Sequence, residues 1–356
     1  METTAMVDVI RSWTSGEINN FIKIWLSAGV SLSYCFFSGK ILRKGPPRLA
    51  AFLPVVFLFL LLPLHLRSVH LGGTTAFFLA WLANFKLLIF AFDQGPLSHP
   101  SISLPKFVAV ACLPIRLHHR NPNYKSESRR ESSAFNYAVK AALFAAIIKC
   151  YDYEDRIHPR IILVIYSFHI YFCLELILAV AAAVARALLA AELEPQFDEP
   201  YLSASLQDFW GHRWNLTVTR MLRPTVYLPV RGLAARLVGR RWALLPAVMS
   251  TFVVSGLMHE LIFFYLGRVR PTWEITCFFV LHGACLVIEI VVKKAVGDTW
   301  RLPRIAGAIL TVGFVMATGF WLFFPPLLRC KADERAMVEI AAVGAFVKDF
   351  VLAVQF

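Results

Sequence analysis

Charged residues are scarce in this chain, and their scarcity excludes most soluble folds. Of the 356 residues, 17% are charged and 58% are hydrophobic, whereas soluble domains have about 25% charged and roughly 45–50% apolar residues. So few charges cannot cover the surface of one or two soluble domains of this length. The composition also excludes disordered, collagen-like and coiled-coil chains. It indicates a membrane protein.

Motifs of several enzyme and binding-protein classes are absent as well. No two of the seven cysteines form a C-x-x-C pair, so the sequence indicates neither a disulfide framework nor a zinc site. It contains no G-x-S-x-G elbow, no G-x-G-x-x-G, no P-loop and none of the His-x-x-x-Asp arrangement of soluble acyltransferases. The pair His118 and His119 is too isolated for the histidine boxes of a membrane di-iron oxidase. We therefore expect no bound metal.

Long apolar runs are what the sequence has instead. A bilayer core about 30 Å thick needs about 20 helical residues at about 1.5 Å each. Eight runs approach this length, so we expect an all-α, polytopic protein that forms a single membrane domain over residues 1–356. The runs are 21–38, 48–66, 73–92, 134–150, 161–185, 246–267, 274–292 and 305–328. A ninth run, Phe107 to Ile115, is too short to span, so we expect a re-entrant or interfacial piece.

The loops between these runs alternate in charge. The net charge of +13 would by itself suggest nucleic acid as a partner, but the basic residues gather in the odd-numbered loops, and seven arginines lie in 192–245. The second loop has only Arg67, the fourth (151–160) is acidic, and the sixth, RVRPTW, fits the alternation poorly. Cytoplasmic loops carry an excess of Lys and Arg. We predict eight spans, both termini on the lumenal side, and no nucleic-acid partner.

Ionisable residues inside the apolar runs are candidates for function, because they are costly in a bilayer. His259 lies about two thirds of the way along the run 246–267, and a neutral imidazole accepts a proton near pH 7. Position alone favours a general base and a core histidine bonded to a neighbouring helix about equally. Ser255, one turn earlier, is within reach of His259. Glu260 is displaced by about 100° around the helix and is expected to face another neighbour.

The long loop 192–245 contains a second group of candidates in the segment FWGHRWN, which ends at Asn215. A side-chain amide both donates and accepts hydrogen bonds, so it can orient a thioester carbonyl or a hydroxyl. The tryptophans beside Arg213 are equally typical of a membrane interface. For the other polar residues inside the runs we expect structural roles in helix packing. They are Asn84, Lys86, Glu175 and the pair His282 and Glu289, two turns apart on one helix face.

The segments FWGHRWN and SGLMHE resemble motifs of the plant wax synthases, which are long-chain-alcohol O-fatty-acyltransferases of the membrane-bound O-acyltransferase superfamily. The resemblance extends over nearly the whole chain, in blocks that occur in the family's order. The blocks are WLANFKLLIFAFDQGPLS at 81–98, EPQFDEPYLSASLQDFWGHRWNL at 194–216, STFVVSGLMHELIFFY at 250–265 and PTWEITCFFVLHG at 271–283. The chain departs from the family pattern FWxRRWN at His212.

The resemblance implies a fold in which membrane helices surround a tunnel, with a catalytic histidine at His259 and a partner asparagine at Asn215. It implies a catalytic core over 192–304, made of the motif loop 192–245 and the helix 246–267. The implied reaction moves a long-chain acyl group from acyl-CoA to a fatty alcohol, in the endoplasmic reticulum membrane. Acyl-CoA is then a co-substrate, no further cofactor is needed, and no acyl-enzyme forms. The residues expected at acyl-CoA are Trp210, Arg213, Trp214, Arg220 and Arg223.

Two alternatives stay open at this point. The same chemistry can act on a sterol or diacylglycerol acceptor, since related plant enzymes with sterol specificity look similar and acceptor choice depends on tunnel shape. A transporter or channel would use the intramembrane histidines and glutamates as a proton or ion path. The long motif-bearing loop and the absence of inverted repeats disfavour transport.

Overall fold

The computed structural model describes residues 16–116, 134–189, 192–193, 196–297 and 302–354. Nearly all of the predicted basic loop 116–133, with His118 and His119, lies outside the described residues. Contacts along the chain define two compact units. The first comprises Met1–Leu113, Arg220–Ala295 and Trp321–Phe356, and the second comprises Pro114–Thr219 and Val296–Phe320. The predicted catalytic core 192–304 contributes residues to both units.

The described chain is almost entirely helical, which confirms the predicted fold class. Seven of its helical stretches are long and apolar enough to cross a membrane, and each coincides with a predicted run to within a few residues. They are Ile18–Ile41, Pro46–His65, Val69–Ala91, Pro159–Val180, Leu244–Gly267, Glu274–Val296 and Arg304–Arg329. The predicted span 134–150 is the exception. It forms α7 (Ala134–Cys150), whose 17 residues extend about 25 Å, less than a hydrocarbon core of about 30 Å.

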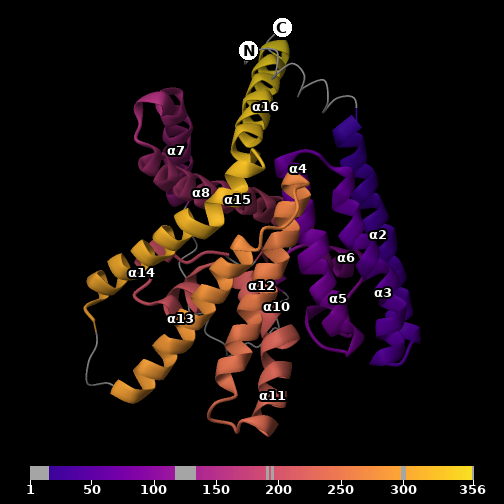
Figure 1. Cartoon of the computed structure of the whole chain (residues 1–356). Helices are drawn as coiled ribbons and strands as arrows, with labels where there is room; N and C mark the ends of the chain where they lie inside the picture. Colours follow the sequence, from indigo (N-terminus) through magenta and orange to yellow (C-terminus); the bar gives the residue numbers. More distant parts are fainter. Residues whose placement is uncertain (1–15, 117–133, 190–191, 194–195, 298–301, 355–356) are drawn as a thin grey trace. The chain divides into compact units, whose positions relative to one another are not determined.

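In the first unit, α2 (Ile18–Ile41), α3 (Pro46–Leu61), α5 (Asn84–Ala91) and α6 (Leu104–Cys112) pack beside one another (Figure 1). The stretch Val69–Ala91, which is built from α4 (Val69–Thr75), the π-helix η3 (Ala76–Ala83) and α5, is the most enclosed of the candidate spans, since 78% of its apolar window is buried. The η3 part of this stretch, AFFLAWLA, is apolar on all sides, as expected of a helix surrounded by others.

The helix α6 has nine residues, so the short run is confirmed as a piece that does not span. Buried Lys86 on α5 holds the end of α6, because its Nζ donates to the carbonyls of Val110 and Leu113. Asn84 donates to the Val56 carbonyl at 3.1 Å. Both contacts satisfy backbone carbonyls, which agrees with the structural roles predicted for these residues.

Two glycines allow close packing of α12 (Leu244–Gly267) and α13 (Glu274–Val296). A Cβ added at Gly256 would lie 3.0 Å from the Thr276 Cα, and one at Gly283 would lie 2.9 Å from the Phe252 Cβ. Small residues at such positions are the usual basis of close helix packing in membranes.

Two buried glutamates hold the N-terminal end of α4 in the first unit. Glu17 accepts hydrogen bonds from the backbone N–H groups of Arg67 and Ser68 at 2.6 and 2.7 Å. Glu339, on α16 (Ala332–Val354), accepts from the Ser68 hydroxyl and from the backbone N–H groups of Val69 and His70. Negative charge is favourable at a helix N-terminus, so both contacts stabilise the position of α4.

In the second unit, α7 pairs with α8 (Pro159–Leu189). Lys140 on α7 forms an ion pair with Glu175 on α8, and both side chains are nearly buried, at 9% and 11% exposure. This contact confirms a structural role for Glu175. Two-residue strands, β1 (Ile115–Arg116) and β2 (Glu192–Leu193), pair antiparallel.

The remaining described elements are also helical, and all of them except α14 are short. They are η2 (Leu62–His65), η4 (Pro96–Ser98), η5 (Tyr151–Arg156), η6 (Pro200–Leu202), α9 (Leu206–Asp208), η7 (Phe209–Arg213), α10 (Leu216–Leu222), η8 (Arg223–Tyr227), α11 (Leu228–Leu237), α14 (Arg304–Thr318), η9 (Gly319–Phe323) and α15 (Phe324–Arg329).

Candidate active site

His259 lies on α12, in the first unit, and its ring is held by its own helix. The Nδ1 atom lies 2.7 Å from the Ser255 carbonyl oxygen. A carbonyl can only accept, so Nδ1 carries the proton and the lone pair of the neutral ring is on Nε2. Among the described residues none forms a hydrogen bond with Nε2. The half-buried ring therefore has a bonded side and a side that can accept a proton.

Aromatic side chains from three elements surround the His259 ring. Phe279 on α13 has its ring centroid 4.4 Å away, Trp81 on η3 meets the imidazole edge-on at 5.1 Å, and Phe323 on η9 lies at 6.1 Å. Trp81 and Phe279 are buried. These contacts pack against the imidazole and limit its rotation. A single sequence gives no signal for them, because aromatic residues in apolar runs are ordinary core residues.

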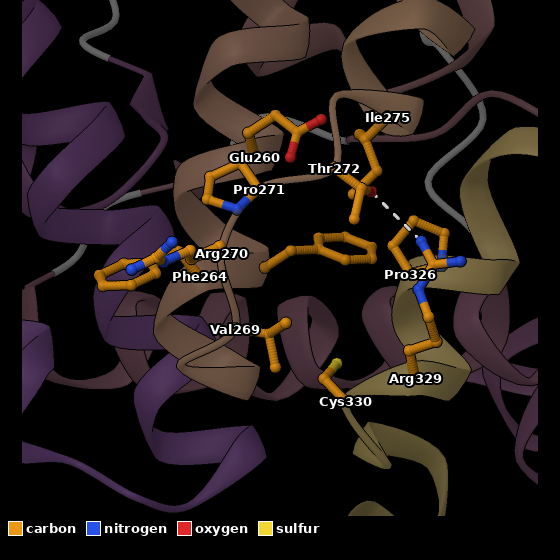
Figure 2. Close-up of a pocket in the computed structure, with 11 residues that line it drawn as sticks. Glu260, Phe264, Val269, Arg270, Pro271, Thr272, Ile275, Pro326, Arg329 and Cys330 are labelled. Carbon is orange, nitrogen blue, oxygen red and sulfur yellow. Dashed lines mark hydrogen bonds between the residues drawn. The ribbon is translucent and has the colours of Figure 1, made fainter.

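Glu260 faces away from His259, as the sequence predicts, and bonds to the next helix, α13. Its buried carboxylate accepts a hydrogen bond from the Thr276 N–H, in the first turn of α13, at 3.1 Å. Glu260 also lines a small, open pocket together with residues that include Pro271, Thr272 and Arg329. Figure 2 shows Pro271 and Ile275 beside Glu260, with Arg329 bonded to Thr272 on the other side of the pocket. His259 is not among the pocket's lining residues.

Asn215 lies in the second unit, at the start of α10. Its backbone is left-handed, with φ of 44°, a conformation that Asn tolerates better than most residues. The side-chain Oδ1 accepts from the Val218 N–H at 3.4 Å, so Asn215 caps α10. Within the described part of the chain, Nδ2 has no hydrogen-bond partner. The amide therefore keeps its donor side for another group.

The segment before Asn215 is held by internal contacts, and these include two residues expected at acyl-CoA. Arg213 Nε donates to Asp208 at 2.9 Å, and Nη1 donates to the Asp198 carbonyl at 3.0 Å. Trp214 stacks on Phe209, with centroids 5.5 Å apart. Arg213 and Trp214 thus have structural contacts that the sequence did not predict. Contact of either residue with acyl-CoA stays a prediction.

The other residues expected at acyl-CoA differ in exposure. Arg223 is exposed at the start of η8, in the first unit, and Arg220 is half-buried on α10. Trp210, in the second unit, is half-buried, and its carbonyl accepts from the Thr219 hydroxyl at 3.0 Å. His212, where the family pattern has arginine, exposes 67% of its side chain and lies 3.8 Å from Asp208.

The second intramembrane histidine is enclosed by aromatic packing. His282 is completely buried on α13, with its ring 4.2 Å from that of Phe278, and Glu289 forms an ion pair with Lys293. Across the residues that the structure describes, no group of three His, Cys, Asp or Glu side chains is arranged to hold a metal ion.

Comparison with known proteins places this arrangement in a family. A model of the membrane-bound O-acyl transferase family matches residues 193–281. Acyl-CoA–sterol O-acyltransferase 1 of Arabidopsis thaliana is 49% identical over 331 residues, which are 92% of this chain and 96% of that protein. The long-chain-alcohol O-fatty-acyltransferase of Simmondsia chinensis is 48% identical over 330 residues, or 91% and 94%. Probable long-chain-alcohol O-fatty-acyltransferase 3 of Arabidopsis thaliana is 45% identical over 334 residues, or 93% and 96%. The chain belongs to the membrane-bound O-acyl transferase family and, within it, to the group that contains the long-chain-alcohol O-fatty-acyltransferases.

Proposed function

We propose that the protein transfers a long-chain acyl group from acyl-CoA to the hydroxyl of a long-chain fatty alcohol, with His259 as the general base and Asn215 as its partner. The observation that carries the proposal is the state of His259. Its Nδ1 is bonded to the Ser255 carbonyl, and no described residue bonds to Nε2. Relatives whose names state acyl-CoA and long-chain-alcohol acyl transfer support the reaction class.

The reaction is direct transfer between two substrates. His259 Nε2 takes the hydroxyl proton as the alcohol oxygen bonds to the thioester carbonyl carbon. The carbonyl oxygen becomes negative, and the Asn215 Nδ2 group donates a hydrogen bond to it. The carbon–sulfur bond then breaks, and the imidazolium returns its proton to the CoA thiolate. The products are an ester and CoA, and no acyl-enzyme forms.

Acyl-CoA binding is proposed for the arginine-rich segment around Asn215. Exposed guanidinium groups, such as that of Arg223, bind phosphates through charge-assisted hydrogen bonds. Trp210, Arg213, Trp214 and Arg220 complete the proposed set. The acyl chain and the alcohol would both lie in the apolar environment of the membrane, and the compartment proposed is the endoplasmic reticulum.

A sterol acceptor is the second candidate, because one relative at 49% identity is named as an acyl-CoA–sterol O-acyltransferase. An acceptor panel with purified protein separates the two. Acyl-CoA is supplied with a long-chain alcohol, a sterol or diacylglycerol, and the released CoA thiol and the ester are measured against a sample without acceptor. We expect the highest kcat/KM with the alcohol. A preference for sterol would overturn the acceptor and leave the mechanism, whereas no acceptor-dependent CoA release would overturn acyl transfer itself.

A further inference from the structure

Gln196 holds the backbone that follows Asn215, although nineteen positions separate them in the sequence. Its backbone carbonyl accepts a hydrogen bond from the Leu216 N–H at 2.9 Å. Its side-chain Nε2 donates to the Thr217 hydroxyl oxygen at 2.5 Å. The Gln196 and Thr217 side chains are buried, with residue exposures of 5% and 3%. Two hydrogen bonds from one buried residue therefore fix the two positions after Asn215.

The position before Asn215 is fixed by the neighbouring residue of the same segment. The Phe197 ring lies 5.0 Å from that of Trp214, and both contact buried Tyr171 on α8, at 5.5 and 6.4 Å. The Trp214 N–H also donates to the Phe209 carbonyl at 2.8 Å. The pair Gln196 and Phe197 thus contacts the chain on both sides of Asn215.

Asn215 needs such contacts because its backbone conformation is not a preferred one. With φ of 44°, its backbone lies in the left-handed region, where a non-glycine residue persists only if its surroundings determine it. The weak cap to Val218, at 3.4 Å, cannot by itself define the direction of the amide. Loss of the contacts that follow Asn215 would let its backbone and its amide rotate.

We propose that Gln196 is a positioning residue for Asn215: through its hydrogen bonds to Leu216 and Thr217 it sets the direction in which the Asn215 amide donates. The inference rests on the proposed role of Asn215 in acyl transfer. Gln196 is buried, so we expect it to act through Asn215 and not by contact with a substrate. Its loss is expected to lower kcat and to leave the KM for acyl-CoA nearly unchanged, because the transition state needs the directed amide more than the bound substrate does.

The test compares two substitutions at one position. Thr217→Val removes the hydroxyl and nearly keeps the shape, whereas Thr217→Ser keeps the hydroxyl. We expect Thr217→Val to lower kcat by about 10- to 100-fold and to leave KM for acyl-CoA within about twofold, whereas Thr217→Ser should keep wild-type kcat. Gln196→Leu removes the donor of the same hydrogen bond. Since both variants remove one interaction, the double variant should lose no more than either single one.

The same substitutions on an Asn215→Gly background separate this inference from the proposed function. Glycine accepts the left-handed backbone and lacks the amide. If the bond acts through Asn215, Thr217→Val has no further effect on that background. An equal loss of kcat on both backgrounds, or wild-type kcat for folded Thr217→Val and Gln196→Leu, would overturn the inference. Wild-type kcat for Asn215→Gly alone would instead overturn the proposed role of Asn215. Melting temperature and gel-filtration profile identify the folded variants.

Discussion

The two ring nitrogens of His259 differ in their bonding, and the sequence left open whether this residue is a general base or a core histidine. Its Nδ1 is bonded to a carbonyl of its own helix, where the core-histidine alternative expected a carbonyl of a neighbouring helix, and no described residue bonds to Nε2, as the proposed general base requires. The sequence predicted Ser255 as the neighbour. The structure shows that the contact is to its backbone carbonyl. In a helix the carbonyl four residues earlier is within reach of many side chains, so residue types alone could not identify it.

The rest of the candidate site was predictable to different extents. The cost of burying an imidazole in a bilayer marked His259, whereas Asn215 stood out mainly through its resemblance to a family motif. The contacts of Arg213 with Asp208 and the Asp198 carbonyl were not predictable. The sequence cannot distinguish an arginine that is available to a ligand from one that stabilises a loop. The difference depends on backbone carbonyls that come near the guanidinium group only when the loop is folded.

Asn215→Asp tests the amide with little change in shape. Aspartate keeps the oxygen that caps α10 and tolerates the left-handed backbone, but when ionised it lacks the Nδ2 donor. We expect a folded protein with kcat lowered by about 10²–10³-fold, the usual effect of removing one oxyanion donor. Steady-state kinetics and a melting curve measure both properties. Asn215→Asp with wild-type kcat would show that the amide donates nothing in the transition state.

At the scale of elements, the close contact of α12 and α13 places Phe279 against His259. We expect Gly283→Ala to lower both the melting temperature and kcat, because the added methyl would lie 2.9 Å from the Phe252 Cβ and must separate the helices. Gly29→Ala is the matched control, since Gly29 lies in α2 and has no atom within 4 Å of the added Cβ. Equal behaviour of the two variants would argue against tight packing at Gly283.

The contact of α16 with α4 depends on the ionised carboxylate of Glu339. Burial by itself would raise the pKa of Glu339, but hydrogen bonds from His70 and the Val69 N–H outweigh it and hold the pKa below its usual value. Stability from this group is therefore complete above the unfolded pKa of about 4.3 and is lost as the pH falls through the lower folded pKa.

Glu339→Gln measures this contribution. We expect the variant to be less stable by about 1–3 kcal/mol at neutral pH, because an amide NH₂ would face the N–H groups that the carboxylate accepts. The difference in melting temperature from wild type should shrink as the pH falls below about 4. A difference that is constant from pH 7 to below 4 would contradict the assignment.

Sequence reasoning predicted the long helices well, because an apolar run of about 20 residues has few other folds in a bilayer. It was less successful at α7, whose 17 residues are short for a span and include Lys140. Pairing with Glu175 neutralises this lysine, and intramembrane ionisable groups are tolerated when paired in this way. That partner lies 35 residues away and could not be identified from the run itself.

At the scale of the whole molecule, loop charge and helix length disagree over α7. If α7 does not cross, the basic loop 116–133 and the seven arginines of 192–245 would face opposite sides of the membrane. The excess of Lys and Arg in cytoplasmic loops therefore predicts that α7 crosses together with α8, in which case local thinning of the bilayer would accommodate the short span.

Glycosylation tags in two loops test whether α7 crosses the membrane. We expect a tag in 151–160 to be modified in microsomes, because that loop is predicted to be lumenal, and a tag in 116–133 to stay unmodified. A tag in 192–245 should stay unmodified as well, and its modification together with an unmodified tag in 151–160 would show that α7 does not cross. Modification in 116–133, or the same result for both test loops, would show that the predicted eight-span topology is wrong.

Turnover of purified His259→Ala with acyl-CoA and the preferred acceptor tests direct acyl transfer with His259 as the base. Ser255→Ala is the matched control, since it keeps the backbone carbonyl that holds Nδ1. We expect His259→Ala to keep the wild-type melting temperature and to lose about 10²–10⁴-fold in kcat, whereas Ser255→Ala should stay close to wild type. Wild-type ester formation by folded His259→Ala would contradict a general-base role for His259.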